Sequence, residues 1–264
     1  MAAYQKLKAA RANGRPTASA YIRQMFENTL ELHGDRKFGD DPAMLGGVGW
    51  LGDLPVTYIA IEKGDSTQER IRRNFGCPKP EGYRKALRLM QQAEKFHRPV
   101  VCLVDTSGAY CGEDAEQRGQ GQAIADNLLH MMQLQTPVIS VVIGEGGSGG
   151  ALGIAVADRV YMLENAVYSV ISPEGCASII WKDAGMVAQA AEHLRITATD
   201  MVELGVAERV IPENFEQFDQ MCEQLKTQLL SDFAALSALP AEQMLQQRYA
   251  RFRSIGQYQE TENA

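Results

Sequence analysis

Residues 138–152 read Val-Ile-Ser-Val-Val-Ile-Gly-Glu-Gly-Gly-Ser-Gly-Gly-Ala-Leu, an apolar run followed by five glycines in the seven positions from Gly144 to Gly150. The apolar run predicts a strand covered on both faces, as in a parallel sheet. Glycine permits positive φ and a close approach of the backbone to a ligand. The small residues that follow predict a helix reaching about Ala157. Free N–H groups at the start of that helix would suit an anion or a developing oxyanion.

One interpretation of the glycine run is a dinucleotide-binding loop. Gly144, Gly146 and Gly149 match the pattern Gly-x-Gly-x-x-Gly, and Glu164 lies 20 residues after the first of them, where such sites place a carboxylate that binds ribose. A run this rich in glycine fits many patterns by accident. A Walker A loop is excluded, because no Gly-Lys-Ser or Gly-Lys-Thr follows the glycines.

Other interpretations concern the end of the run. Gly146 to Gly150 match Gly-x-Ser-x-Gly, the turn that presents a nucleophile, here Ser148, in hydrolases. His193 is the only histidine after it and lies in a stretch typical of a solvated helix. A backbone oxyanion hole needs no nucleophile, because two N–H groups aimed at one point stabilise a charged oxygen by roughly 3–4 kcal/mol per donor. The glycines could also form only a tight turn packed under a helix.

A second loop of the same kind follows the apolar run Val100–Val104, about 40 residues earlier. It reads Asp-Thr-Ser-Gly-Ala-Tyr-Cys-Gly over 105–112 and precedes a predicted helix from about Ala115 to Leu134. In a parallel sheet both loops would emerge at the carboxyl ends of their strands, where ligands usually bind. We expect Asp105 to cap its own turn and Tyr110 to pack against the body or stack on a flat ligand.

The rest of the chain predicts an α/β layered fold. Strands that alternate with helices favour a sheet with right-handed crossovers, and the long tail has the apolar stripe of a packed helix. The predicted elements are a helix over Tyr21–His33, a hairpin of Met44–Trp50 and Val56–Glu62, a helix over Gly82–His97, strands over Val160–Leu163 and Val167–Ile171, and a helical tail over Glu213–Tyr249.

Composition narrows the functional class. The chain has 264 residues and a net charge of -7, which does not suggest a nucleic-acid partner. Its five cysteines include no Cys-x-x-Cys pair, so we expect no zinc ribbon and no metal. Met1–Pro16 lacks the apolar segment of a signal peptide, and no apolar run reaches the roughly 20 residues of a membrane span. We therefore expect a cytoplasmic protein.

A basic stretch over 69–85 is a third candidate for ligand contact. Arg72, Arg73 and Lys85 lie beside a loop that contains proline and glycine. Cations in such a place could receive phosphates or a carboxylate. They could equally form a solvated face or a subunit contact.

Several of these runs resemble the α subunit of bacterial acetyl-CoA carboxylase carboxyltransferase. The resemblance extends, in order, from about Thr17 to Tyr249. It rests on Lys63-Gly, Ile71-Arg-Arg-Asn-Phe-Gly, Pro80-Glu-Gly-Tyr-Arg-Lys-Ala-Leu-Arg-Leu-Met, Asp105-Thr, Gly108-Ala-Tyr, Ala115-Glu, Arg118-Gly-Gln, Val142-Ile-Gly-Glu-Gly-Gly-Ser-Gly-Gly-Ala-Leu and Tyr168-Ser-Val-Ile-Ser-Pro-Glu-Gly-Cys-Ala-Ser-Ile.

The resemblance implies a crotonase-like (ClpP/crotonase) α/β fold of repeated ββα units, with residues 1–264 as a single carboxyltransferase domain. A short helical segment over about 1–35 and a helical tail over about 213–255 would flank it. The implied partners are a β subunit that carries a zinc ribbon, a biotin carboxyl carrier protein and biotin carboxylase. An α2β2 assembly would convert acetyl-CoA to malonyl-CoA for fatty acid synthesis.

The resemblance also implies roles for the glycines. Carboxybiotin, held by the carrier protein, would supply the carboxyl group, and oxyanions would develop on biotin and on the thioester. Gly149 and Gly150 would donate their N–H groups to the biotin oxygen. The biotin side of the site would be lined by Gly108, Ala109, Tyr110, Gly112, Gly147 and Ser148.

The sequence departs from the family pattern in the second loop. Ser107 and Cys111 stand where the family has proline, so we expect a less rigid loop. Two alternatives therefore stay open. One is another crotonase-type acyl-CoA enzyme, which would need an acid from among Glu113, Asp114, Glu145 and Glu174. The other is a non-catalytic regulatory paralogue.

Overall fold

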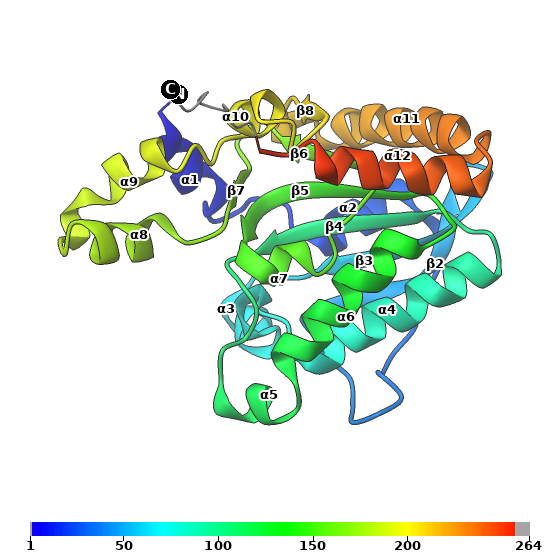
Figure 1. Ribbon diagram of the computed structural model, residues 1–264, viewed down its shortest axis with the longest axis horizontal. Coiled ribbons are helices and arrows are strands. Elements are labelled where there is room, and N and C mark those ends of the chain that lie inside the picture. Colours follow the sequence, from blue (N-terminus) through cyan, green and yellow to red (C-terminus); the bar gives the residue numbers. More distant parts are fainter. Residues whose placement is uncertain (1, 257–264) are drawn as a thin grey trace, which may run out of the picture.

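The computed structural model describes residues 2–256 and is built around one eight-stranded sheet (Figure 1). The strand order is β1-β2-β3-β4-β5-β6-β8, and β7 pairs with β5 outside this path. The strands are β1 (Glu27–Glu31), β2 (Met44–Leu51), β3 (Leu54–Ile61), β4 (Val100–Thr106), β5 (Val138–Gly147), β6 (Arg159–Leu163), β7 (Val167–Ser169) and β8 (Arg209–Ile211).

Helices cover both faces of the sheet. They are α1 (Ala3–Ala10), α2 (Ala18–Met25), α3 (Thr67–Arg72), α4 (Pro80–Lys95), α5 (Glu113–Gln117), α6 (Gln120–Gln133), α7 (Ser148–Leu152), α8 (Pro173–Ile180), α9 (Val187–His193), α10 (Ala198–Glu203), α11 (Phe218–Ser237) and α12 (Ala241–Arg253). Short 3-10 turns lie at η1 (Asn74–Gly76), η2 (Ala184–Met186) and η3 (Phe215–Gln217).

Along the strand path of the sheet, β2 alone runs opposite to the other strands. The predicted hairpin is present, because β2 pairs antiparallel with β3 and also with β1. From β3 onward the pairs on this path are parallel, so the carboxyl ends of β3, β4 and β5 meet at one edge. The first half of β5 pairs with β6 and its last three residues pair with β7. The glycine-rich end of β5 therefore exchanges β6 for β7 as its neighbour, while Gly146 still pairs with Thr106 of β4.

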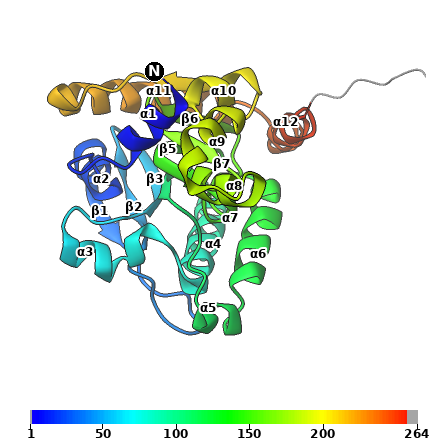
Figure 2. The same ribbon diagram turned by 90° about the vertical axis from the view of Figure 1, so that its left-hand side faces the viewer.

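The core has the double-sided burial that the sequence predicts. All of β4 and the first nine residues of β5 are buried, as expected for parallel strands covered on both faces. Helices α4 and α6 pack together on one face, and α2 and α11 lie on the other (Figure 2). Tyr21 of α2 meets Phe218 of α11 with ring centroids 4.9 Å apart.

Three predicted helices were too long. The one over Tyr21–His33 ends at Met25, after which Phe26 turns extended and β1 begins. The one over Ala115–Leu134 is broken at Gly119, whose φ of 82° lies in the left-handed region. The tail is two helices, because Pro240 cannot continue α11.

The glycine run also divides differently from the prediction. Strand β5 continues to Gly147, so only the last glycines reach the helix, and α7 stops at Leu152 rather than Ala157. Strand β7 ends at Ser169, two residues early. The expected helical segment over 1–35 holds two helices and the edge strand β1.

Candidate functional site

The two glycine loops lie against each other at the carboxyl ends of β4 and β5. Thr106 pairs with Gly146 across the sheet. A Cβ added at Gly147 would run into the carbonyl of Ser107. A Cβ added at Gly150 would run into the amide of Ala109 and would lie 2.6 Å from the carbonyl carbon of Gly108. Glycine is required at 147 and 150 because the backbones of the two loops touch there.

Helix α7 begins at this contact. Ser148, Gly149 and Gly150 are its first three residues, so their N–H groups have no acceptor within the helix. Gly147 at the N-cap position has no side chain that could accept from them. Ser148 is exposed and adopts a φ of 52°, Gly149 is partly exposed, and Gly150 is buried. Uncapped donors at a helix start suit an oxygen that gains negative charge.

Two buried side chains, from α4 and α6, hold the backbone carbonyls of α7 and of the residue that follows it. The Tyr83 hydroxyl donates to the carbonyl of Gly150 at 3.0 Å. The Asn127 side-chain amide donates to the carbonyl of Gly153 at 2.9 Å. Tyr83 also fills the space that a side chain at 153 would take. The start of α7 is therefore held rigidly while its N–H groups stay free.

The loop over 107–112 is held by side chains. The Thr106 hydroxyl donates to the carbonyl of Gly108 at 2.8 Å. The amide of Gly108 in turn donates to the Thr106 hydroxyl oxygen at 3.0 Å. Gln120 donates to the carbonyl of Tyr110 at 2.7 Å and to the carbonyl of Pro78 at 2.8 Å. The ammonium of Lys79 lies 4.8 Å from the centre of the Tyr110 ring. Tyr110 thus contacts a cation, in addition to any packing role.

A charged cluster lies beneath both loops. Lys63 pairs with Asp105 at 2.7 Å and with Glu145 at 3.0 Å. Arg11 pairs with Glu145 at 2.8 Å and with Glu174 at 2.6 Å. Asp105 accepts the amide of Glu145 at 2.8 Å, so the prediction that it caps its own turn was wrong. Burial lowers the pKa of Lys63, but the two carboxylates outweigh burial and the pKa is raised.

The basic stretch does not join this site. Arg72 is exposed and pairs with Glu69 at 3.3 Å, and Arg73 pairs with the same carboxylate and donates to the carbonyl of Pro42. Lys85 is 1 % exposed, and its ammonium contacts Asp40 at 2.5 Å. The structure therefore does not bring these three cations to the glycine loops, and Lys85 has a structural role.

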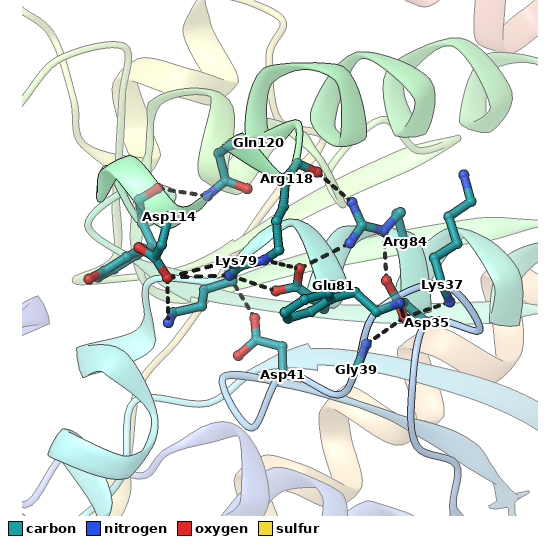
Figure 3. A network of polar contacts seen from close by, with 12 residues as sticks. Asp35, Lys37, Gly39, Asp41, Lys79, Glu81, Arg84, Asp114, Arg118 and Gln120 are labelled. Atoms are coloured by element: carbon teal, nitrogen blue, oxygen red, sulfur yellow. Dashed lines mark hydrogen bonds and ion pairs between the residues drawn. The ribbon is translucent and has the colours of Figure 1, made fainter. Parts of the chain in front are cut away.

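A second polar network connects α4 with α5, the helix that follows the loop over 107–112 (Figure 3). Glu81 accepts from Arg118 at 2.7 Å and from Arg84 at 3.0 Å. Arg118 and Lys79 both reach Asp114, at 3.4 and 3.3 Å. Sequence reasoning missed Lys79 and Gln120 as supports of the loop, and Glu81 as the partner of Arg118 at the end of α5. The signal was available, because Pro80-Glu-Gly-Tyr and Arg118-Gly-Gln are among the runs that the resemblance rests on.

An apolar pocket lies next to the glycine loops. A pocket of about 530 Å³ opens beside Ser148 and Gly149 and is lined mostly by apolar side chains, including Leu152, Met201 and Phe252. Among residues 2–256, no group of three or more His, Cys, Asp and Glu side chains could hold a metal ion. No helix in this part of the chain is long and apolar enough to cross a membrane.

The geometry does not support two of the alternatives for the glycine run. Gly144 and Gly146 lie inside strand β5 rather than in a turn after it, so they cannot form a dinucleotide-binding loop. His193 ends helix α9 and stacks on Trp181 with ring centroids 5.9 Å apart. That placement gives Ser148 no contact with a histidine base.

Comparison with known proteins assigns the family. A family model described as acetyl co-enzyme A carboxylase carboxyltransferase-like matches residues 1–256. The acetyl-coenzyme A carboxylase carboxyl transferase subunit alpha of Ruminiclostridium cellulolyticum is 56 % identical over 256 residues, which cover 97 % of this chain and 98 % of that protein. The chain belongs to this family. The subunit of the same name in Clostridium acetobutylicum is 54 % identical, with 98 % of this chain and 96 % of that protein covered.

A further relative places the same sequence in a longer protein. A Natranaerobius thermophilus protein named as subunits beta/alpha is 52 % identical over 264 residues, which cover 98 % of this chain and 44 % of that protein. In that relative, one polypeptide thus carries both names.

Solved structures agree on the fold. A transcarboxylase 12S chain superposes with a TM-score of 0.67 at 19 % identity, covering 97 % of this chain and 47 % of that one. A malonate decarboxylase hetero-tetramer from Pseudomonas, in complex with coenzyme A, gives a TM-score of 0.66 at 19 % identity, covering 82 % and 91 %. The chain spans about half of the transcarboxylase chain. These neighbours confirm the predicted crotonase-type α/β fold.

Proposed function

We propose that this chain is the α subunit of an acetyl-CoA carboxylase carboxyltransferase, which moves a carboxyl group from carboxybiotin to acetyl-CoA and forms malonyl-CoA for fatty acid synthesis. The observation that carries the proposal is the contact between the two glycine loops, with the uncapped start of α7 beside it. Family membership over nearly the whole chain supports the same activity.

In this proposal the N–H groups of Gly149 and Gly150 donate to an oxygen that becomes negative during transfer. Carboxybiotin, when bound, supplies the carboxyl group. The glycine backbone fits a flat polar ring at this point, because no side chain at 149 covers the donors and Gly147 keeps the neighbouring backbone close. Each donor of this kind contributes about 10²–10³ in kcat.

The proposal assigns the rest of the biotin side to the second loop and to Ser148. The backbone of Gly108, Ala109 and Gly112, the ring of Tyr110 and the exposed Ser148 would line it. Their support by Gln120 and Tyr83 would keep the donors in place before the substrate arrives, which is the arrangement that electrostatic catalysis requires.

The proposal assigns the remaining parts of the reaction to partners. A β subunit with a zinc ribbon would complete the site, a biotin carboxyl carrier protein would present carboxybiotin, and biotin carboxylase would load it. The fused beta/alpha relative supports a β partner. We further propose an α2β2 assembly, a single domain over residues 1–264 and a cytoplasmic location.

The acids that a self-sufficient acyl-CoA enzyme would use are engaged in structural contacts. Glu145 and Glu174 pair with Arg11, and Asp114 pairs with Arg118. Glu113 accepts from Gln117 on exposed α5. This arrangement does not favour the alternative of another crotonase-type enzyme.

The decisive test is carboxyl transfer by the complex with the β subunit encoded in the same genome. We expect co-purification and transfer from malonyl-CoA to biotin. Gly149→Pro removes one N–H and should abolish turnover, while Gly149→Ala keeps the N–H and meets no atom closer than 3.9 Å, so its loss should be much smaller. Circular dichroism of both variants checks folding.

The other outcomes point elsewhere. A stable complex without turnover would indicate the regulatory paralogue. Activity of the isolated chain on an acyl-CoA, without a β subunit, would indicate the self-sufficient enzyme. Equal losses in the alanine and proline variants would show that the N–H of Gly149 is not the donor.

A further inference from the structure

Lys63 lies where three neighbouring strands end. It follows β3, while Asp105 lies near the end of β4 and Glu145 near the end of β5. Its ammonium contacts one oxygen of each carboxylate, at 2.7 Å and 3.0 Å. The same oxygen of Asp105 also accepts the amide of Glu145 at 2.8 Å. One cation therefore joins the bases of both glycine loops.

This bridge lies two residues from the contact between the loops. Asp105 precedes Ser107 by two positions and Glu145 precedes Gly147 by two, and the backbones of Ser107 and Gly147 touch. Because only two residues separate each carboxylate from that contact, a change in the distance between the carboxylates would change the distance between the two loops. The N–H groups of α7 begin one residue later.

The surrounding sequence makes room for the bridge. A Cβ at Gly144 would lie 2.6 Å from the carboxyl carbon of Asp105. Gly76 has a φ of 75°, and a Cβ there would meet the Lys63 side chain at 2.5 Å and the Asp105 carbonyl at 3.0 Å. Two glycines thus accommodate this pair, one of them in a conformation that other residues rarely adopt.

The bridge also removes a repulsion. The side chains of Asp105 and Glu145 are 6 % and 10 % exposed, and Lys63 is 20 % exposed. Two buried carboxylates this close repel each other unless a cation lies between them. Arg11 reaches Glu145 but no contact joins it to Asp105 among the described residues. Lys63 is the group that serves both.

We propose that Lys63 is a positioning residue that holds the two glycine loops at the spacing needed for carboxyl transfer. It touches no reacting atom and acts through Asp105 and Glu145. The expected effect on kcat rests on the proposed function, whereas the effect of Lys63 on the spacing of the loops can be tested separately.

The test compares three variants in the complex with the β subunit. Lys63→Met keeps the length of the side chain but removes the charge, and should lower kcat about 100-fold while the complex still assembles. Lys63→Arg restores a cation and should recover at least a tenth of wild-type kcat. Arg248→Met is the matched control. Arg248, in helix α12, is a buried cation that pairs with a carboxylate, that of Asp158, at 2.8 Å. This variant should lower the melting temperature without lowering kcat at 25 °C.

Amide hydrogen exchange supplies a readout that does not depend on activity. In Lys63→Met, exchange should rise in residues 105–112 and 144–150 together, and it should stay unchanged there in Arg248→Met. An active Lys63→Met complex with wild-type kcat, or unchanged exchange in either loop, would overturn the proposal. If the wild-type complex shows no transfer, the proposed function fails instead, and the exchange result still decides whether Lys63 fixes the loops.

Discussion

The two glycine loops meet at one point but are held in different ways. The loop over 144–150 is a continuation of strand β5, paired with β7 on one side and β4 on the other. The loop over 107–112 leaves its strand and is held by the side chains of Thr106, Gln120 and Lys79. Strand pairing, supplemented by Tyr83, fixes the first loop, whereas the second is held mainly by side chains and by one backbone bond from the Tyr110 amide to the carbonyl of Pro78 at 3.0 Å.

This difference assigns separate tasks to the loops. In the proposed reaction the rigid loop carries the donors, whose positions must not change as charge develops. The other loop is the more adaptable wall of the site, and it contains Ser107 and Cys111, where the resemblance to the family leads us to expect proline. The four predictions below test the contact between the loops, a buried ion pair far from them, the buried carboxyl that binds the amide of Lys79, and one support of the adaptable loop.

Gly150→Ala should have the largest effect, about 10³-fold in kcat or ~4 kcal/mol. Its Cβ would enter the backbone of the other loop at Gly108 and Ala109 and force the loops apart. Steady-state transfer with the β subunit measures the loss. Gly149→Ala, whose Cβ would make only an ordinary contact with Ile124 at 3.9 Å, is the comparison, and similar losses in both variants would argue against the packing explanation.

Arg248→Met should separate stability from activity. The guanidinium pairs with Asp158 at 2.8 Å and donates to the carbonyls of Met131 and Leu134. Its loss leaves a buried carboxylate unpaired and should cost roughly 3–4 kcal/mol, or about 10 °C in the melting temperature. Calorimetry gives the shift. A fall in kcat at 25 °C would show that the far side of the fold also sets the geometry of the loops.

Asp41→Asn should change how stability depends on pH. Asp41 accepts the amide of Lys79 at 2.7 Å, and burial raises its pKa to about 6 from an ordinary 3.8. A carboxyl with a raised pKa favours the folded state below about pH 4, and this contribution is lost as pH rises through 6. Relative to the variant, the wild type should lose up to about 3 kcal/mol over this range. Urea unfolding at several pH values measures it, and parallel curves would contradict it.

Gln120→Glu should weaken only the adaptable loop. The change is nearly isosteric but places an oxygen where an N–H₂ group donates to the carbonyls of Tyr110 and Pro78. We expect about a ten-fold loss of kcat/KM for the biotin carrier, and faster amide exchange over 107–112 but not over 144–150. Equal changes in both loops would show that the loops are not supported independently.

Much of the fold could be predicted because each buried strand is a continuous apolar run in the sequence. The apolar runs at 100–104 and 138–143 match the buried parts of β4 and β5, and the hairpin follows from its turn at Gly52. The misplaced helix over Tyr21–His33 shows the limit. The apolar spacing of Ile22, Met25 and Leu30 fits a helix, yet the edge of β2 captures the chain after Met25 as β1.

The glycine contact of the site could be predicted only as two separate loops. Glycine content shows where a backbone can approach closely, but the sequence does not state which other backbone fills the space at Gly147 and Gly150. The same limit applies to charges. Arg72 and Lys85 look available in the sequence, but ion pairs with Glu69 and Asp40 occupy them. The partner of Arg72 lies one turn away in the same helix, whereas Asp40 comes from a distant segment that only the fold brings beside Lys85.

The short edge strand β1 has a consequence for the subunit on its own. All five of its residues are exposed, Glu27 and Glu31 lie at its two ends, and its register with β2 is interrupted between Glu27 and Leu30. An open sheet edge invites pairing with another chain, and charged ends and an irregular register discourage it. The charged ends and irregular register of β1 should therefore discourage self-association along the antiparallel side of the sheet.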